Sequence, residues 1–532
     1  MISTIRSLRA ARRANGLVLF LILVALFVSV LTWILTGASQ LVILSGMGIA
    51  LVFIGMAIAR DWRSGVYAFI ACLLFEDLAR KYLGNNLLLF FGHDVLAIAT
   101  FVSLLAAKAR RQVAWFRPPF LASLAPLFGL AALQVFNPGS PSVLYGLLGM
   151  KLYFLYVPMM YAGYAMFENG EDVQRFLMFN LYLGTVIAAL GIAQSILGLS
   201  FLNPADIAPD LLDLTSVVRG SVENGLVPQV TSVFASGGRF GAFIIVLVIL
   251  AMGAQAYLLL ARRRQAIWAG AALAVALVAA IQSGSRSVII YSIINLLALS
   301  AGFLWGAPWH WAQGRRLVKS VRRGLLVVAV GLLLTVQLFP RAIGGSWYYF
   351  YDTMSPTSEN SELGARVWDY PIGGFESAFQ DGHWLFGQGT GTASLGTQYV
   401  AELLNTPRIA PTGAESGFGT LVKEMGIAGL VAWLVFAASL LSHAWKAVKQ
   451  TRQTSYFPLA LSIFWYAFIL LLPLTYIAIS PYQNYVTNAY FWVLIGVLFR
   501  LPNLAQSREI ATPQTARSFP VQCREATVSL NS

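Results

Sequence analysis

The sequence predicts an all-α polytopic membrane protein with about 14 transmembrane helices. Of its 532 residues, 58% are hydrophobic and only 11% are charged, and the mean hydropathy is +0.70. Soluble domains usually contain about 25% charged residues. The net charge of +14 falls mainly at the borders of the apolar runs, which favours contact with lipid headgroups over binding of nucleic acid.

Apolar runs long enough to cross a bilayer define the elements of this fold. Each has roughly 15 to 27 residues, close to the length of helix that spans the hydrocarbon core. The predicted spans are residues 17–36, 41–59, 64–79, 87–107, 119–136, 143–165, 174–198, 239–261, 265–282, 287–306, 324–340, 416–442, 456–479 and 485–499. Together they form a transmembrane domain over residues 17–500, between an N-terminal tail (1–16) and a polar, aperiodic C-terminal tail (501–532) that we expect to be disordered.

The distribution of basic residues predicts the orientation in the membrane. When successive loops are assigned alternately to the two sides, most of the 36 lysines and arginines fall on the side of the N-terminal tail. Such an excess is typical of cytoplasmic loops. Both termini are therefore expected in the cytoplasm.

Two loops on the opposite, outward side are long, over residues 199–238 and 341–415. In the second loop, apolar residues recur at a helical spacing, at Trp368, Ile372, Phe375 and Phe379. This spacing predicts an amphipathic helix. Such a helix would lie on the membrane or cap a cavity, or it would pack on the core of the loop itself.

Two arginines stand at the outward start of a predicted span. Arg286 follows a break in "SGSRSVII" (283–290), and Arg239 follows two glycines in "SGGRFGAF" (236–243). The N-terminus of each helix directs the positive end of its dipole outward, and a guanidinium beside it completes an anion site. Two such sites at one face could hold a pyrophosphate. The alternative is that both side chains extend to lipid headgroups.

Glu415 also lies at the outward start of a predicted span, at the depth of these arginines. Its carboxylate could act as a general base toward a hydroxyl, or it could offset the helix dipole as a cap. Glu424 lies deeper in the same span beside Lys423, with which it is expected to pair.

A dense group of ionisable residues surrounds another outward turn, in "FEDLARKYLGNNLLLFFGHD". The group comprises Glu76, Asp77, Arg80, Lys81, His93 and Asp94. In apolar surroundings such residues are costly unless they are paired or functional. A structural ion-pair network and a substrate-binding role are both consistent with the pattern.

The sequence contains no motif for metal or nucleotide binding. The glycine-rich stretch "FGQGTGTASLGT" (386–397) lacks the spacing of a dinucleotide-binding loop, and no phosphate-binding GxxxxGK[ST] or zinc-binding HExxH sequence occurs. The two cysteines and four histidines form no ligand pattern. We therefore expect neither a metal ion nor a cofactor.

Four segments together resemble the O-antigen ligases and Wzy-type exopolysaccharide polymerases. They are "FEDLARKYLGNNLLLFFGHDVL" (75–96), "SGSRSVII" (283–290), "WLFGQGTGT" (384–392) and "ESGFGTLVKEMGIAGLVAWL" (415–434). The resemblance extends from about residue 75 to 445 in order and membrane placement. It implies the C-type membrane glycosyltransferase fold, with a long periplasmic loop containing short helices.

The resemblance also implies a function at the periplasmic face of a bacterial inner membrane. Enzymes of this kind transfer a glycan from undecaprenyl pyrophosphate to an acceptor, usually without a metal ion. On this basis Arg239 and Arg286 match the arginines that hold the pyrophosphate, and Glu415 replaces the histidine of the ligases as the catalytic base. Further substrate-binding residues implied by the matching segments are Arg80, Lys81, Arg366, Arg408 and Ser285.

The replacement of histidine by Glu415 favours a polymerase over a ligase, and direct attack opposite the pyrophosphate implies inversion. The implied partners are an oligosaccharide linked to undecaprenyl pyrophosphate, membrane lipids, a chain-length regulator and the export machinery, with no nucleic acid. Two alternatives remain open. One is a ligase that transfers the glycan to a lipid or protein acceptor, and the other is a transporter or flippase, because buried charges also mark transport paths.

Overall fold

A computed structural model of the chain describes residues 54–511, apart from residues 59, 85–88, 90, 205–217, 222–224, 310, 339–349, 356–357, 359–360, 363, 381 and 407–414. The predicted N-terminal tail, the span at 17–36, most of the span at 41–59 and Arg408 therefore lie outside the described residues. So do residues 512–532 of the predicted C-terminal tail.

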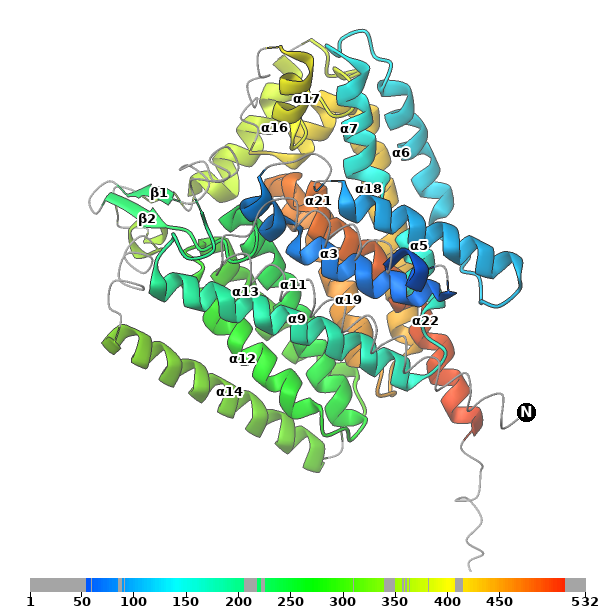
Figure 1. Ribbon diagram of the computed structural model, residues 1–532, viewed down its shortest axis with the longest axis vertical. Coiled ribbons are helices and arrows are strands. Elements are labelled where there is room, and N and C mark those ends of the chain that lie inside the picture. The colour runs from blue at the N-terminus through cyan, green and yellow to red at the C-terminus, as the bar shows by residue number, and fades with distance from the viewer. Residues whose placement is uncertain are drawn as a thin grey trace, which may run out of the picture.

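Helices make up most of the described chain (Figure 1). They are α3 (Trp62–Leu83), α5 (Gly92–Ala109), α6 (Leu121–Gln134), α7 (Val143–Phe154), α8 (Met159–Ala165), α9 (Gly170–Leu197), α11 (Gly237–Leu260), α12 (Ala266–Gln282), α13 (Arg286–Gly306), α14 (Trp311–Leu338), α16 (Tyr370–Gln380), α17 (Thr397–Leu404), α18 (Gly417–Gln450), α19 (Phe457–Ile469), α20 (Thr475–Ile477), α21 (Ser480–Gln483) and α22 (Tyr485–Ala511), with π-helices η1 (Ala365–Asp369) and η2 (Leu470–Leu474). Strands β1 (Val218–Ser221) and β2 (Gly225–Pro228) form an antiparallel hairpin with Val218 opposite Pro228.

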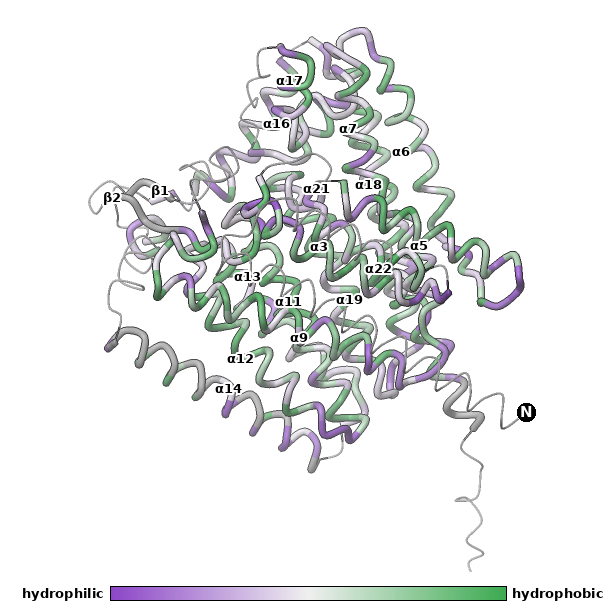
Figure 2. Tube along the Cα trace, viewed as in Figure 1, coloured by the Kyte–Doolittle hydropathy of each residue, from purple (hydrophilic) through white to green (hydrophobic). Residues whose placement is uncertain are grey.

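Apart from the β1–β2 hairpin, the regular structure of the described residues is helical, as expected of a polytopic α-helical membrane protein. Eight helical segments among them are long and apolar enough to cross a membrane: Gly92–Ala109, Val143–Ala165, Gly170–Leu197, Gly237–Leu260, Arg286–Gly306, Gly417–Gln450, Phe457–Ile477 and Tyr485–Gln506. The helices α6 and α12 are apolar but shorter. Figure 2 shows hydrophobic residues along these helices and hydrophilic residues gathered at many of their ends. The total of about 14 spans stays a prediction.

Several helices extend beyond the predicted boundaries, and α18 continues to Gln450, past the predicted end at residue 442. The helix α14 begins at Trp311, whereas residues up to 323 were expected to form a basic loop before a span at 324–340. At the C-terminus, α22 continues through Pro502 to Ala511, and Leu501 and Leu504 are buried. The expectation of disorder from residue 501 was therefore wrong for this part of the tail, because its apolar residues pack on the bundle.

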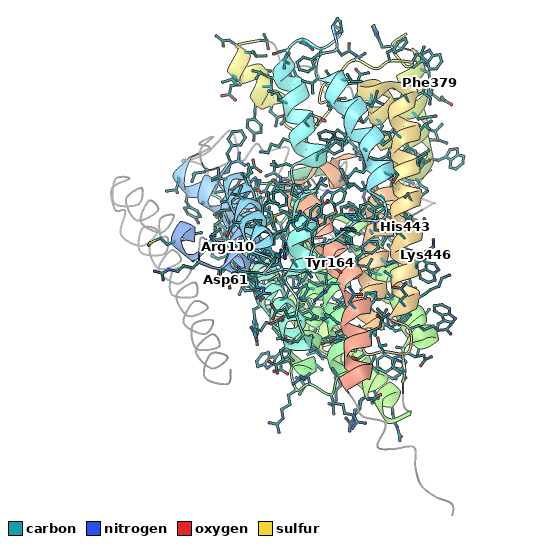
Figure 3. The ribbon with its side chains drawn as sticks, turned by 90° about the vertical axis from the view of Figure 1, so that its right-hand side faces the viewer. Asp61, Arg110, Tyr164, Phe379, His443 and Lys446 are labelled. Carbon is teal, nitrogen blue, oxygen red and sulfur yellow. The ribbon has the colours of Figure 1, made fainter. Side chains whose placement is uncertain are left out.

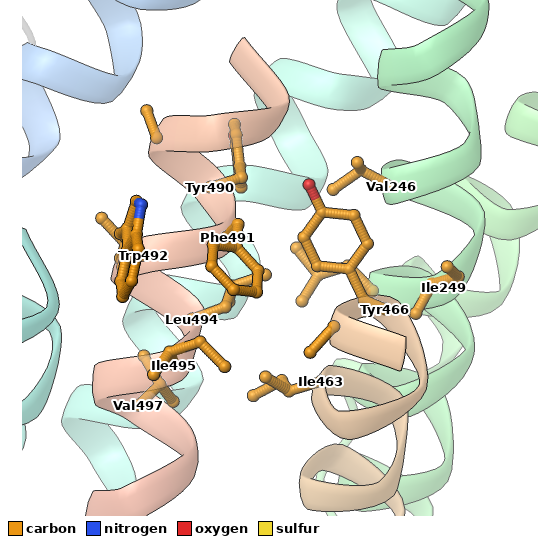
Figure 4. Close-up of a cluster of buried hydrophobic side chains, with 14 of the residues drawn as sticks. Val246, Ile249, Ile463, Tyr466, Tyr490, Phe491, Trp492, Leu494, Ile495 and Val497 are labelled. Carbon is orange, nitrogen blue, oxygen red and sulfur yellow. The ribbon is translucent and has the colours of Figure 1, made fainter. Parts of the chain in front are cut away.

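The helices α11 and α22 are the most completely buried of the apolar helices. The first packs on α9, α12, α13 and α19, and the second packs on α8, α18 and α19. Between them Tyr466 of α19 faces Val246 and Ile249 of α11 and the aromatic side of α22 (Figure 4). Its hydroxyl donates to the carbonyl oxygen of Thr487 at 2.7 Å. The phenol thus buries its ring without leaving its polar atom unsatisfied.

The long helix α18 is interrupted at Gly426, where φ is 70° and ψ is −177°. The break frees backbone groups that lipid cannot satisfy. The glycine-rich stretch and the residues just before it supply three partners. Gln388 N donates to Lys423 O at 2.7 Å, and Gly389 N donates to Glu424 O at 3.1 Å. Trp384 O accepts from Ile427 N at 2.8 Å. This backbone clamp requires a glycine at position 387, where φ is 76°, because a side chain there would lie 2.5 Å from the Glu424 carbonyl oxygen.

The amphipathic helix predicted in the second long loop exists as η1 followed by α16. It packs on α18, with Phe375 and Phe379 half-buried, while Trp368 is exposed. In a view turned by 90°, Phe379 lies beside the upper end of α18, and His443 and Lys446 lie along its lower half (Figure 3). The helix therefore rests on one end of a transmembrane helix.

Close packing of α8 on α22 depends on two glycines. A methyl group at Gly163 would lie 2.1 Å from the Val493 carbonyl oxygen, and one at Gly496 would lie 2.0 Å from the Met160 carbonyl oxygen. Each helix thus presents a glycine to the backbone of the other, as is common between membrane helices.

We predict that Gly163→Ala lowers the stability of the protein by about 1 to 3 kcal/mol, because the added methyl forces the two helices apart. The measurement is the free energy of unfolding in detergent, followed by circular dichroism. Gly129→Ala on α6 is the matched control, since nothing lies within 4 Å of the added carbon there. An equal effect of both substitutions would contradict the packing argument.

Candidate functional site

The helices α11 and α13 begin side by side. A methyl group at Gly241 of α11 would lie 2.6 Å from Val288 of α13 and 3.9 Å from the Ser285 hydroxyl, so no side chain separates the helix starts. Arg239 and Arg286 stand in the first turns of these two helices. We call this end of the bundle the arginine end.

Asp77 is the centre of a buried cluster at the arginine end. Its carboxylate accepts hydrogen bonds from Arg239 Nη1 at 2.9 and 2.7 Å and from Arg80 Nη1 at 3.1 Å. A fourth hydrogen bond comes from the backbone N–H of Ala235 at 2.9 Å. The side chains of Asp77 and Arg80 are almost fully buried, whereas a quarter of the Arg239 side chain is exposed. Arg239 is therefore the member of the cluster that a ligand could reach.

Lys81 completes this Asp77 cluster, which consists of Asp77, Arg80, Lys81 and Arg239. The Lys81 ammonium donates to Thr231 Oγ1 at 3.1 Å and to the Ser232 carbonyl at 2.9 Å. The side-chain carbonyl of Gln194 in turn accepts from the backbone N–H groups of both residues. Lys81 is thus held in place by neutral oxygen atoms, and burial lowers the pKa of its ammonium group to about 7, although the nearby Asp77 raises it.

A second buried group adjoins the Asp77 cluster. Here His93 lies between two carboxylates, with Nδ1 against Glu76 and Nε2 at 3.1 Å from Asp94. The Lys151 ammonium lies 2.6 Å from the other oxygen of Asp94. We call Glu76, His93, Asp94 and Lys151 the His93 network. The ion-pair network expected from the sequence around the outward turn is therefore present, and it recruits Lys151 from α7, which sequence reasoning missed.

Tyr485 connects the two groups. Its ring stacks on His93 with 4.8 Å between ring centroids, and the Arg239 guanidinium lies 4.9 Å from the same ring. In the Asp77 cluster, two guanidinium groups, those of Arg80 and Arg239, share the single carboxylate of Asp77. This part of the membrane domain thus carries an excess of positive charge, and a buried excess of that kind favours an anionic ligand.

A chain of ion pairs lies at the start of α13. Arg286 Nη2 donates to Glu362 Oε2 at 2.9 Å, and Arg366 Nε donates to the same oxygen at 3.0 Å. Arg366 Nη1 then donates to Glu415 Oε2 at 2.5 Å. This ion-pair chain, Arg286–Glu362–Arg366–Glu415, brings together three residues predicted from the sequence.

Glu362 is the member that sequence reasoning missed. A signal was available, because Glu362 stands four residues before Arg366, the spacing at which an acidic and a basic side chain meet on a helix. Partial burial alone would raise the pKa of Glu362, but the hydrogen bonds from Arg286 and Arg366 outweigh it and lower that pKa. The charged Glu362 carboxylate therefore stabilises the ion-pair chain. This contribution is lost only as the pH falls through the lowered pKa of Glu362.

Partial burial tends to lower the pKa of Arg366, but the contacts of its guanidinium with Glu362 and Glu415 raise this pKa overall.

The exposed fractions of the side chains decrease along the ion-pair chain toward the membrane domain. They are 46% for the Glu415 side chain, 44% for Arg366, 34% for Glu362 and 9% for Arg286. The chain therefore leads from solvent-accessible groups to a buried guanidinium.

Glu415 does not cap α18. Ser416 is the N-cap residue, and its hydroxyl accepts from the Gly419 N–H at 3.1 Å. The capping role that was the alternative for Glu415 thus belongs to its neighbour. Glu415 precedes the helix and directs its carboxylate to Arg366.

Glu424, expected to pair with Lys423, has a different set of partners. Its buried carboxylate accepts from Tyr153 Oη at 3.0 Å, Ser394 Oγ at 2.7 Å and Ala393 N at 3.1 Å. It therefore fastens the glycine-rich stretch to the broken helix α18, beside the backbone hydrogen bonds at the break.

The predicted site residues thus divide between two groups. Arg80, Lys81 and Arg239 belong to the Asp77 cluster, and Arg286, Arg366 and Glu415 belong to the ion-pair chain. Ser285 precedes α13, with its hydroxyl 3.1 Å from that of Ser287. Arg408 lies outside the described residues. The packing of α11 on α13 brings the two groups to the same end of the bundle.

A comparison of the chain with protein-family models found no matching family, and a search of curated proteins found no matching sequence. Within the residues that the structure describes, no three histidine, cysteine or acidic side chains are grouped closely enough to hold a metal ion. The charged groups at the arginine end are therefore the candidate functional site.

We predict that Asp77→Asn destabilises the folded protein by about 3 to 5 kcal/mol, because it leaves buried cations without their shared carboxylate. Thermal unfolding of the purified protein in detergent measures this loss. Asp369→Asn, which removes a carboxylate from an exposed position, should change stability by less than about 0.5 kcal/mol. Near-equal unfolding temperatures for the two variants would show that Asp77 is not needed to hold these cations.

Proposed function

We propose that the protein is a membrane glycosyltransferase that joins repeat units linked to undecaprenyl pyrophosphate. The observation that carries the proposal is the pair of adjacent helix starts bearing Arg239 and Arg286, beside a buried group with excess positive charge. A diphosphate carries the opposite charge and presents several oxygens to forked guanidinium groups. The reaction belongs at the periplasmic face of a bacterial inner membrane, with both termini in the cytoplasm.

The chemistry needs no metal ion if guanidinium groups stabilise the leaving group. A hydroxyl of the acceptor sugar attacks the anomeric carbon of the donor from the side opposite the diphosphate. The new carbon–oxygen bond forms as the bond to the diphosphate breaks, so the configuration inverts. The departing diphosphate gains negative charge, which Arg239 and Arg286 would stabilise.

Glu415 is the group proposed to accept the proton of the attacking hydroxyl. Its carboxylate is nearly half exposed and lies outside the helix, so it is accessible to a sugar. One of its oxygens accepts a hydrogen bond from Arg366. A general base needs a free oxygen within hydrogen-bonding reach of the proton, so the ion pair must loosen when substrates bind.

The remaining proposed partners follow from this assignment. The donor is the growing chain on its lipid carrier, and the acceptor is the next lipid-linked repeat unit. Membrane lipids surround the apolar helices, and a chain-length regulator and export machinery would act on the product. Arg80 and Lys81 would contribute to substrate binding through the charge of the Asp77 cluster.

A second candidate of another class is a transporter or flippase. The His93 network favours it, because buried chains of histidine and carboxylates also occur along proton paths in transporters. The two functions are separable with protein reconstituted in lipid vesicles. Transport without any change in glycan length would reject the polymerase, and polymerisation would support it. Replacing the lipid-linked acceptor by a lipid or protein acceptor tests the ligase alternative.

We predict that Arg286→Lys reduces polymer formation by roughly 100-fold, because lysine keeps the charge but loses the planar fork that binds two oxygens. Gel analysis of the lipid-linked glycan formed by purified protein measures the change. The control is Arg175→Lys, at a largely exposed arginine in the first turns of α9, at the opposite end of the bundle. Normal polymer from Arg286→Lys would exclude bidentate binding of the diphosphate.

We predict that Glu415→Gln reduces the rate of polymerisation by about 10²- to 10⁴-fold while donor binding persists, because an amide cannot accept the proton. Rates of chain extension and donor binding are measured on the same preparations. Glu402→Gln on α17, an exposed position, serves as control. If Glu415→Gln extends chains at the normal rate, another group is the base.

A further inference from the structure

One oxygen atom of Glu362 occupies the space between two guanidinium groups. Glu362 Oε2 accepts from Arg286 Nη2 at 2.9 Å and from Arg366 Nε at 3.0 Å. A single anionic oxygen shared by two arginines is also the arrangement that a bound phosphate group provides. This carboxylate thus fills a position suited to a diphosphate oxygen.

The nearly buried Arg286 requires a counter-ion. Only 9% of its side chain is exposed, and an unpaired charge at that depth is costly. Glu362, in contrast, is one-third exposed and lies in the segment between α14 and η1, outside the helices that could span the membrane. A partner with this placement can compensate Arg286 and still exchange with solvent or ligand.

Release of Glu362 needs only a rotation of its side chain. Its backbone is fixed, because its N–H donates to Thr353 O at 2.9 Å and its carbonyl accepts from Arg366 N at 2.8 Å. The carboxylate can therefore leave the two arginines without a movement of the loop. Arg366 and Arg286 would then offer their donors to an incoming anion.

We propose that Glu362 is a resident counter-ion that holds Arg286 and Arg366 in place and is displaced by the diphosphate of the donor. This inference rests on the proposed function, since the displacing anion is the pyrophosphate of the lipid carrier. Glu362 is accordingly a positioning residue, which acts through the arginines and contributes no bond to the reacting atoms.

Displacement of Glu362 also affects the contacts of Glu415. Arg366 holds Glu362 through Nε and Glu415 through Nη1, so its guanidinium is shared between the two carboxylates. When Arg366 turns toward a diphosphate, its contact with Glu415 weakens and the carboxylate becomes available to the acceptor hydroxyl. Binding of the donor and release of the base are thereby coupled through one side chain.

A displaceable counter-ion affects the affinity for the diphosphate in a way that a purely structural salt bridge does not. If Glu362 competes with the ligand, the measured dissociation constant equals the intrinsic constant divided by the fraction of molecules in which Glu362 has left the arginines. Removing its charge should therefore tighten binding, by about threefold to tenfold for a pair of this exposure. If Glu362 only orients the arginines, its removal should weaken binding instead.

The test measures binding of farnesyl diphosphate to the purified full-length protein in detergent, at fixed ionic strength, by isothermal titration calorimetry. Glu362→Gln should lower the dissociation constant by about threefold to tenfold relative to the unmodified protein. Glu362→Asp keeps the charge on a shorter side chain and should give a smaller decrease, which provides a second variant if the first folds poorly. Glu376→Gln, at an exposed position of α16, removes the same charge away from the arginines and should leave binding unchanged.

The outcomes separate this inference from the proposed function. Tighter binding by Glu362→Gln, with Glu376→Gln unchanged, supports the counter-ion role. If the unmodified protein binds farnesyl diphosphate and Glu362→Gln binds it equally or more weakly, the inference is overturned while the diphosphate site stands. If neither the unmodified protein nor any variant binds the probe, the diphosphate site itself is rejected.

Discussion

The need to pair charges inside an apolar bundle determines how the arginine end is built. Asp77 of α3 is fully buried, and its carboxylate is satisfied by Arg80 of the same helix, by Arg239 of α11 and by the Ala235 backbone. Breaking such a buried pair costs far more than an exposed one. The relative placement of α3 and α11 is therefore tied to Asp77, and this in turn sets where the guanidinium of Arg239 can lie.

A second constraint acts on the backbone of α18. Lipid offers no hydrogen-bonding partners, so the break at Gly426 persists only because the glycine-rich stretch satisfies the exposed groups. Glu424 adds side-chain contacts to Tyr153 and Ser394 at the same point. The loop that carries Glu362 and Arg366 is thus attached to α18 at two places. One is α16, and the other is the glycine-rich stretch that follows α16 in the sequence. The break gives this loop a fixed support close to the start of α18, where Glu415 lies.

The spans and the arginines could be predicted from sequence because each depends on local properties. Uninterrupted apolar runs indicate membrane helices, and Arg239 and Arg286 stand out as charges at their starts. Lys151 could not be found in this way, since its role arises from a contact with Asp94, which is distant in the sequence. The spacing of Glu362 and Arg366 was a local signal that was missed, but the contact of Glu362 with Arg286 could not be predicted. The clamp at Gly426 was also missed, because a glycine in an apolar run is equally consistent with an intact helix.

The Asp77 cluster and the ion-pair chain differ in how easily their side chains can exchange partners. In the Asp77 cluster the carboxylate and Arg80 are sealed from solvent, and the neighbouring Lys81 is held by protein oxygens, so exchange of partners there would expose costly charges. In the ion-pair chain three of the four side chains are a third or more exposed, and water can replace a lost partner at little cost. The buried cluster is thus suited to supply a constant positive field, whereas the exposed chain is suited to exchange its partners. The proposed transfer reaction would need both properties, because the field would persist through the reaction while the contacts of the proposed base and of the diphosphate would form and break in every cycle.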